Sequence, residues 1–209
     1  MNRFHRWFCR SAQWRRTVEQ RVPWVVSDVP LGHRVLELGP GPGLTTDFLR
    51  QKSEKVIALE LDPGLASSLR TRLLGSNADV VTGDATAMPF PDETFSGVVA
   101  FTMLHHVPSP ELQDKVFRQA WRVLEPGGVF VGSDSLQSWR MRLIHIGDTL
   151  VPVDPKTLGA RLEAAGFSVV AVERGPDAFR FHARKVARTE NCVTPTTGKP
   201  VRRKSHEGN

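Results

Sequence analysis

Short apolar runs alternate with amphipathic stretches along most of this chain. Seven runs rich in Val, Ile, Leu, Phe and Ala predict β-strands, at residues 33–38, 55–60, 78–82, 95–101, 129–133, 167–172 and 179–183. Helical periodicity occupies most of the intervals between them. This alternation predicts an α/β fold, doubly wound, with a mostly parallel seven-stranded sheet that helices cover on both faces. A short Arg-Gly-Pro-Asp turn separates the last two runs, which predicts an antiparallel terminal hairpin.

Three of the predicted helices share the same start signal. A capping residue is followed directly by proline in Asp62-Pro63, Ser109-Pro110 and Asp154-Pro155. The capping side chain accepts a hydrogen bond from a free backbone N–H, and proline at the next position has no N–H to leave unpaired. We also expect Gly127-Gly128 to end the helix that precedes the fifth strand.

The two ends of the chain differ from its centre. Residues 1–27 have apolar side chains at helical spacing, with arginines on other faces, and we expect Pro23 to bend or end this helix. The helix could pack permanently on the domain, close over a pocket as a lid, or lie on a membrane surface. Residues 185–209 have no apolar period, which predicts a disordered basic tail. The predicted organisation is therefore a helical lid (1–30), one catalytic domain (31–184) and a tail (185–209).

The length and composition of the chain indicate one folded domain. With 209 residues and 40% hydrophobic residues, the chain suits one domain with a real core. No apolar run reaches the ~20 residues that a bilayer span needs, and the first residues lack a signal-peptide centre. Cys9 and Cys192 are far apart and have no metal-ligand spacing, so we predict free thiols, no metal site and a cytoplasmic location.

The net charge of +6 is concentrated at the termini. Residues 1–21 and 180–209 carry 14 basic and three acidic residues, so the part between them is net acidic. Enzymes of nucleic acids usually carry a basic face on the folded body, which makes a nucleic-acid partner unlikely here. The basic ends are expected to be solvated, although contact with RNA or anionic lipid remains an alternative.

The strand at 33–38 runs directly into Gly39-Pro40-Gly41-Pro42-Gly43, and a helical pattern follows. Glycine lets the backbone turn sharply and lets a ligand approach it closely. Between a strand and a helix, such a loop presents backbone N–H groups to a nucleotide-like molecule. The spacing G-x-G-x-G differs from the dinucleotide fingerprint G-x-G-x-x-G, which argues against a nucleotide-dependent oxidoreductase. A purely structural turn is the alternative.

Polar residues also stand at the ends of later strands. Glu60 ends the second strand, where a carboxylate can accept the hydroxyls of a ribose. Asp84 ends the third strand and could accept the exocyclic amine of adenine. His105 and His106 follow the fourth strand. Because histidine titrates near neutral pH, either could act as a catalytic base, whereas a structural role for at least one of them is the alternative.

Taken in order, these segments closely resemble the class I S-adenosylmethionine (SAM)-dependent methyltransferases. The similarity covers residues 31–184 and is to the small-molecule, type 11 group that includes ubiquinone and menaquinone methylases. The resemblance implies a Rossmann-like fold, an enzyme, and SAM as cofactor. It assigns cofactor binding to Glu37, Gly39, Gly41, Gly43, Glu60, Leu61, Asp84, Ala85, Phe101 and Thr102.

Each of these residues has an implied role in the family pattern. The glycines of 39–43 would wrap the methionine end of SAM, and Glu37 behind them would hold its amino group, directly or through water. Phe101 and Thr102 would border the sulfonium. The chain departs from the pattern at Ser96, where relatives commonly carry an acid.

The nucleoside half of SAM would meet residues at the next two strand ends. Glu60 would bind the ribose, and Leu61 would pack on the adenine. Asp84 would bind the adenine amine, with the backbone of Ala85 beside it.

The methyl acceptor is expected to bind residues 135–153 and the first helix. Trp139, Ile144, His145 and Asp148 are the candidate substrate residues, and His145 and Asp148 could pair on one helix face. A surface helix with an apolar stripe is the alternative.

The predicted function is methyl transfer to oxygen or carbon of a small, rather apolar acceptor. The alternatives are an RNA or protein methyltransferase that docks through its basic termini, and a non-catalytic SAM-binding protein. The sequence does not predict an oligomeric state.

Overall fold

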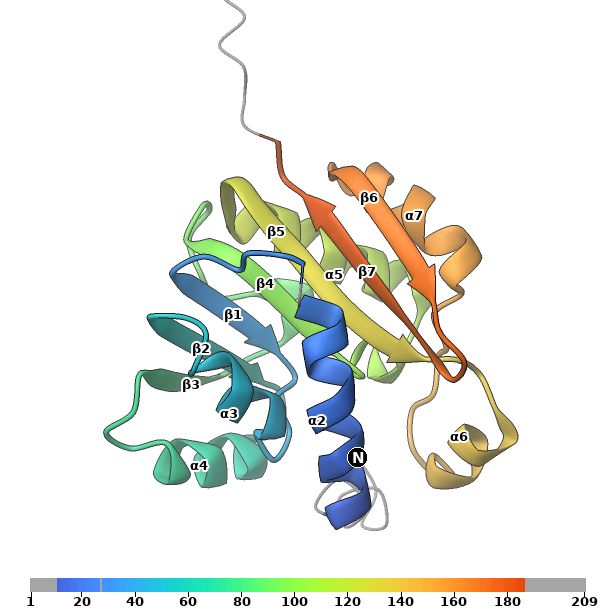
Figure 1. Cartoon of the computed structure of the whole chain (residues 1–209), viewed down its shortest axis with the longest axis horizontal. Coiled ribbons are helices and arrows are strands. Elements are labelled where there is room, and N and C mark those ends of the chain that lie inside the picture. Colours follow the sequence, from blue (N-terminus) through green and yellow to red (C-terminus); the bar gives the residue numbers. More distant parts are fainter. Residues whose placement is uncertain (1–10, 27, 187–209) are drawn as a thin grey trace, which may run out of the picture.

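The computed structural model describes residues 11–26 and 28–186, which form a seven-stranded sheet with helices on both faces (Figure 1). The strand order is β3-β2-β1-β4-β5-β7-β6. The strands are β1 (Arg34–Leu38), β2 (Lys55–Glu60), β3 (Ala78–Thr82), β4 (Phe95–Phe101), β5 (Leu124–Ser135), β6 (Ser168–Arg174) and β7 (Ala178–Arg184). Neighbours from β3 to β5 pair in parallel, whereas β7 pairs antiparallel with β5 and β6. The predicted fold class and the terminal hairpin are thus confirmed.

The helices divide between the two faces of the sheet (Figure 1). They are α2 (Ala12–Val26), α3 (Leu44–Leu49), α4 (Pro63–Arg72), α5 (Pro110–Val123), α6 (Trp139–Ile144) and α7 (Pro155–Ala164), with short 3-10 turns η1 (Ala85–Ala87) and η2 (Leu104–His106). In Figure 1, α2, α3 and α4 lie in front of the sheet, and α5 and α7 lie behind it. Among the described residues, no helix has the length and apolar composition that crossing a bilayer requires.

Each face of the sheet has its own core. Successive strand residues point to opposite faces, so Val35 joins the core under α2, α3 and α4, and Leu36 joins the core under α5 and α7. Both side chains are fully buried, as are most positions of β1, β2 and β4. Burial on both faces explains why these strands read as continuous apolar runs rather than as alternating patterns.

The three predicted helix starts are confirmed by capping hydrogen bonds. Asp62 Oδ1 accepts from the N–H of Gly64 at 2.8 Å, at the start of α4. Ser109 Oγ accepts from the N–H of Leu112 at the start of α5, and Asp154 Oδ1 accepts from the N–H of Lys156 at the start of α7. Each cap is followed by proline in the first turn, so these boundaries follow from two adjacent residues.

Gly127-Gly128 does not end a helix, which corrects the prediction. Helix α5 ends at Val123, and β5 begins at the next residue. The pairing of β4 with β5 shifts register between Phe95 and Gly97, and the extra residues of β5 form an irregularity that contains the two glycines. The N–H of Gly127 donates to the carbonyl of Lys185 at 2.6 Å, so this segment pairs with the chain that follows β7.

Two predicted boundaries at the ends of the chain also change. Helix α2 continues past Pro23 to Val26, so this proline does not end the helix. Lys185, predicted as the first residue of the tail, is buried and donates from Nζ to the carbonyl of Leu124 at 2.7 Å and to Glu93 Oε1 at 3.1 Å. The folded domain therefore includes Lys185. The predicted tail residues 187–209, both cysteines, and the aromatic residues Phe4, Trp7 and Phe8 lie outside the described residues.

Candidate functional site

The glycine loop leaves β1 at the centre of the sheet, where β1 has β2 on one side and β4 on the other. In open parallel sheets, ligands bind beyond the carboxyl ends of the strands at this reversal of strand order. Gly41 has a φ of 54°, and a Cβ placed on it would meet no atom within 4 Å. Its surroundings are therefore open, and a ligand can approach the backbone there.

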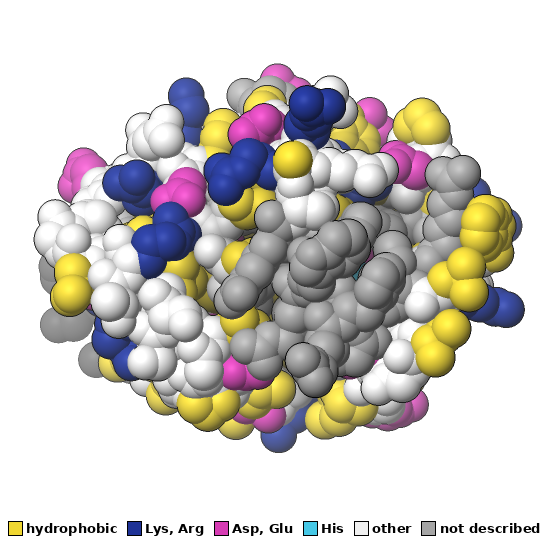
Figure 2. Space-filling model, turned by 90° about the horizontal axis from the view of Figure 1, so that it is seen from below, with side chains coloured by type: hydrophobic (Ala, Val, Ile, Leu, Met, Phe, Trp, Pro, Cys, Tyr) yellow, Lys and Arg dark blue, Asp and Glu magenta, His cyan; other side chains and the backbone are white. Residues whose placement is uncertain are grey.

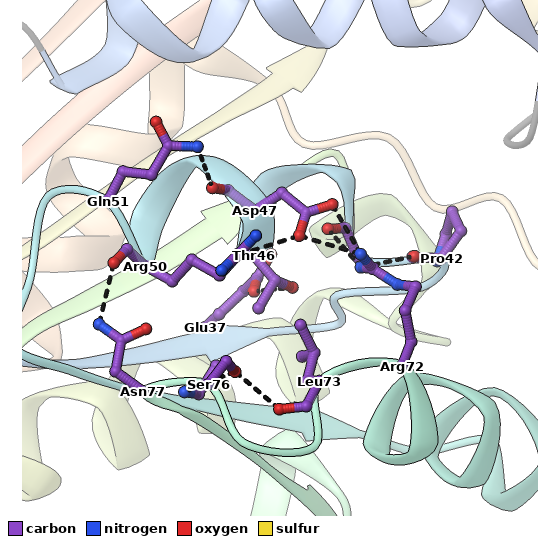
Figure 3. Close-up of polar contacts among 12 residues, drawn as sticks. Glu37, Pro42, Thr46, Asp47, Arg50, Gln51, Arg72, Leu73, Ser76 and Asn77 are labelled. Atoms are coloured by element: carbon purple, nitrogen blue, oxygen red, sulfur yellow. Dashed lines mark hydrogen bonds and ion pairs between the residues drawn. The ribbon is translucent and has the colours of Figure 1, made fainter.

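Gly43 serves the packing of the loop instead. It has a φ of 85°, and a Cβ there would lie 2.3 Å from Nη2 of Arg72 and 2.4 Å from Cδ1 of Leu69. Arg72 donates from Nη2 to the carbonyls of Pro42 (3.3 Å) and Gly43 (3.0 Å), and from Nη1 to the carboxylate of Asp47 (Figure 3). These contacts of Arg72 could not be predicted from the sequence, because nothing in it brings the last turn of α4 against a loop 29 residues earlier.

Glu37 lies behind the loop and is 1% exposed. The hydroxyl of Thr46 donates to Glu37 Oε2 at 2.6 Å (Figure 3). Burial raises the pKa of Glu37 to about 8, and the bond from Thr46 opposes this shift, whereas the carboxylates of Asp47 and Glu60 add to it. Glu37 does not line the cavity described below, so its predicted contact with the amino group of SAM stays a prediction.

Glu60 points into the site from the end of β2. Its Oε2 accepts from the N–H of Gly41 and its Oε1 from the N–H of Asp62, both at 3.0 Å. These two bonds fix the carboxylate and link it to the glycine loop. A carboxylate has about four lone-pair positions, so it can still accept two hydroxyl groups.

Leu61 and Asp84 follow the ends of β2 and β3 in the same cavity wall. The side chain of Leu61 is 68% exposed, which leaves an apolar surface available to a flat ring. Asp84 Oδ1 accepts from the N–H of Thr86 at 2.7 Å and so caps η1, which sequence reasoning did not foresee.

One large cavity joins these groups. It has a volume of about 1130 Å³ and runs from the glycine loop past Glu60 and Asp84 to α6, with α2 along one side. The predicted site residues in its wall are Gly39, Gly41, Glu60, Leu61, Asp84, Ala85, Phe101, Thr102, His105, His106, Trp139, His145 and Asp148. Glu37 and Gly43 are outside that wall, and the side chain of Ile144 lies outside the described residues. Single-ligand pockets occupy about 300–1,000 Å³, so this cavity has room for a cofactor and a second molecule.

The far end of the cavity contains a buried histidine–aspartate pair. His105 is 4% exposed, and its Nδ1 lies 2.6 Å from Oδ1 of Asp134, a residue of β5 with no exposed surface. The backbone N–H of His105 donates to Asp134 Oδ2 at 3.1 Å. A carboxylate accepts only, so Nδ1 of His105 is the donor, and Nε2 is the ring nitrogen left to accept a hydrogen bond. Asp134 was missed in the sequence, although a carboxylate within an apolar strand is an unusual signal.

His106 and His145 lie against this pair. The ring centroids of His105 and His106 are 4.2 Å apart, and that of His145 lies 5.0 Å and 5.1 Å from them. Nδ1 of His145 donates to the carbonyl of Met141 at 2.7 Å. Burial lowers the pKa of His145, the bond to the carbonyl of Met141 opposes this shift, and the nearby His105 adds to it.

The predicted helix face shared by His145 and Asp148 does not form, but the carboxylate of Asp148 lies near enough to raise the pKa of His145, and their pairing stays a prediction. Helix α6 ends at Ile144, and Asp148 follows in the next turn. The backbone N–H of Asp148 donates to the carbonyl of His145 at 2.9 Å. Both residues nevertheless line the cavity.

Figure 2 views the molecule from below and shows hydrophobic side chains gathered on the side of α6, where Trp139, Leu143 and Ile146 are exposed.

Thr102 lies in the cavity wall directly after the end of β4. Its φ of 46° is rare for a β-branched residue, and its N–H donates to the carbonyl of Ser133 at 2.8 Å. Such backbone conformations persist where the surroundings enforce them, and they cluster at functional sites. Ser96 binds both backbone groups of Arg34 through its hydroxyl and so joins β4 to the start of β1.

Comparisons with known proteins agree with this geometry. Residues 36–132 match a protein family described as a methyltransferase domain. The chain is 29% identical over 189 residues to the ubiquinone biosynthesis O-methyltransferase of Pseudomonas fluorescens, covering 79% of each chain. It is 28% identical over 154 residues to a rice 2-methyl-6-phytyl-1,4-hydroquinone methyltransferase, covering 71% of this chain and 46% of the relative. A SAM-dependent methyltransferase structure from Methanosarcina mazei matches 75% of this chain and 94% of its own length, with 20% identity and a TM-score of 0.60.

Residues 36–132 are therefore similar to a methyltransferase domain, and the relatives and the solved structure named above are methyltransferases. The match begins within β1 and ends within β5, so it includes the glycine loop, Glu60, Asp84 and the two adjacent histidines. The segment that contains α6 and His145 follows the matched residues.

Proposed function

We propose that this protein transfers a methyl group from SAM to an oxygen or carbon of a small, rather apolar acceptor. The observation that carries the proposal is the single cavity, which joins the cofactor-binding edge of the sheet to the histidines and α6. The names of the relatives refer to ubiquinone biosynthesis and to a hydroquinone, which favours an aromatic hydroxyl compound as acceptor.

The residues of the cavity fit SAM. The open space at Gly41 suits an extended polar chain, and the remaining lone pairs of Glu60 suit two ribose hydroxyls. Leu61 and Asp84 offer an apolar face and a carboxylate for a nucleobase. When bound, SAM supplies a methyl group that its sulfonium already activates.

The chain itself supplies alignment and proton removal. Holding two reactants in one cavity converts a bimolecular reaction into an effectively unimolecular one. In the proposal, Asp134 fixes the ring of His105, and Nε2 of His105 accepts the proton of the acceptor hydroxyl. Trp139 and Met141 offer the apolar wall against which an aromatic ring packs.

Helix α2 is proposed to cover the reaction. Gln13, Trp14 and Val18 in its first half line the cavity, as does Val22 in its second half, and both Val22 and Val25 are buried in the core. The second half therefore anchors the helix, and the first half is placed to exclude water from the bound reactants.

Product analysis tests the proposal. The protein is incubated with methyl-deuterated SAM and a panel of phenols and hydroquinones, and labelled products are identified by mass spectrometry. We expect a labelled aromatic ether or ring-methylated product, and a fall in kcat of about 10²–10⁴-fold in His105→Gln, the range that a general base supplies. SAM binding without any labelled small product would contradict the proposal and favour a non-catalytic binder. Label incorporated only into RNA or protein would favour an enzyme that docks on a macromolecule.

A further inference from the structure

Three histidines from two separate segments converge at the acceptor end of the cavity. His105 and His106 come from η2 after β4, and His145 follows the last turn of α6. One ring nitrogen from each lies within 4.8 Å of the other two, and all three residues line the cavity. Imidazole nitrogens are the most common protein ligands of zinc and related ions.

Two of these rings make, through Nδ1, the kind of hydrogen bond that histidine ligands of metal ions usually make with their second ring nitrogen. Nδ1 of His105 donates to the carboxylate of Asp134, and Nδ1 of His145 donates to the carbonyl of Met141. Histidines that bind a metal almost always donate their other ring N–H to a carboxylate or carbonyl, which fixes the tautomer and the ring orientation. In both rings, Nε2 is therefore the acceptor nitrogen that a metal ion would use.

Asp134 provides an independent reason for a cation at this point. Its carboxylate has no exposed surface, and a buried negative charge is costly unless a positive charge compensates it. Within residues 11–26 and 28–186, Asp134 pairs with His105, and no lysine or arginine forms an ion pair with it. A divalent ion bound to Nε2 of His105 would place a positive charge across the imidazole ring from the carboxylate of Asp134.

We propose that His105, His106 and His145 bind one Zn²⁺ ion, with a fourth position open to the cavity. Three histidines and one exchangeable ligand make up one of the known catalytic zinc arrangements. An equilateral triangle of nitrogens 4.8 Å apart has its centre about 2.8 Å from each corner, so shifts of roughly 0.7 Å would reach a bond length of about 2.1 Å. Small ring rotations in an open cavity wall supply such shifts.

The fourth position faces the space assigned to the acceptor, and this role of the site rests on the proposed function. An acceptor hydroxyl would replace the water on the ion, and its proton would pass to solvent, because the ion lowers the pKa of a coordinated oxygen. Nε2 of His105 would then be a ligand rather than the base. The ion would orient the acceptor oxygen as well as activate it.

Metal titration without SAM or acceptor tests the site alone. The chain is freed of metal by a chelator and titrated with Co²⁺, whose four-coordinate complexes absorb strongly in the visible range, and the Co²⁺ is then displaced with Zn²⁺. We expect one ion per chain with tetrahedral spectra. We expect an affinity loss of about 10–100-fold in Asp134→Asn, the range for outer-shell partners, and a larger loss in His106→Gln and His145→Gln.

His33→Gln is the matched control, because His33 is exposed and lies before β1, outside the cluster. We expect it to bind Zn²⁺ within twofold of the parent. Unchanged melting temperature and SAM affinity in each variant show that a lost metal site is not a lost fold. Binding of less than one ion, equal affinity in His106→Gln or His145→Gln and the parent, or an equal loss in His33→Gln would overturn the site. Stoichiometric zinc without any methylated product would instead retain the site and contradict the proposed function.

Discussion

Glu37→Gln replaces a fully buried carboxyl group by a neutral group of nearly the same shape. The hydroxyl of Thr46 can donate to the amide oxygen as it does to Glu37 Oε2, so the substitution changes the charge and keeps the bond. Burial raises the pKa of Glu37 from 4.5 to about 8 in the folded chain. The parent therefore holds a proton at this site at pH values where the unfolded chain has already lost it.

The sign of the effect follows from proton linkage. Between pH 4.5 and about 8, the folded state binds more protons at Glu37 than the unfolded state does, so the free energy of unfolding falls as the pH rises. At 1.36 kcal/mol for each pKa unit, the full loss is about 5 kcal/mol, of which about 4 kcal/mol falls between pH 5 and pH 9. Glu37→Gln removes this loss and should be the more stable protein in mildly alkaline solution.

Urea unfolding of parent and variant at several pH values measures the difference. We expect the stability advantage of Glu37→Gln to grow from pH 5 to pH 8 and to level off above that. Glu163→Gln, at an exposed position of α7, is the control and should show no such growth. A constant difference between Glu37→Gln and the parent across this range would refute the assignment of a protonated, buried Glu37.

Three further predictions concern the cofactor, the tail and the lid. Glu60→Gln should weaken SAM binding roughly 10–100-fold, because hydrogen bonds to a charged group contribute about 1.5–3 kcal/mol, and calorimetry showing unchanged affinity would contradict the ribose role. Truncation after Val186 should leave the melting temperature and SAM affinity unchanged, whereas truncation after Arg184 should lower the melting temperature, because it removes the two bonds of the Lys185 ammonium group. Hydrogen exchange should show residues 12–20 more protected with SAM and residues 21–26 protected throughout; equal protection of both halves in both states would leave α2 a structural helix.

Much of the fold could be predicted because its signals are local. Strands β1, β2 and β4 are buried on both faces, so each of them appears in the sequence as an apolar run, and β2, β3 and β4 have the predicted bounds. The helix starts at Asp62, Ser109 and Asp154 depend on a cap and an adjacent proline, which act within one turn. The order of glycines and acids at strand ends predicts the cofactor edge, because parallel strands bring their carboxyl ends together.

Tertiary structure decided what depends on partners distant in the chain. Asp134 lies 29 residues from His105, and only the pairing of β4 with β5 brings them together. The sequence around Arg72 predicts only a helix face, yet its side chain donates to the glycine loop. The sequence around Lys185 predicts a tail, yet its side chain donates to the carbonyl of Leu124. Gly127 is a residue typical of helix ends, but β5 begins as soon as α5 ends. The N–H of Gly127 therefore donates to the carbonyl of Lys185 instead of ending a helix. Local chemistry thus determines where the capped helices begin, whereas the packing of the sheet determines where β5 begins and which side chains form the site.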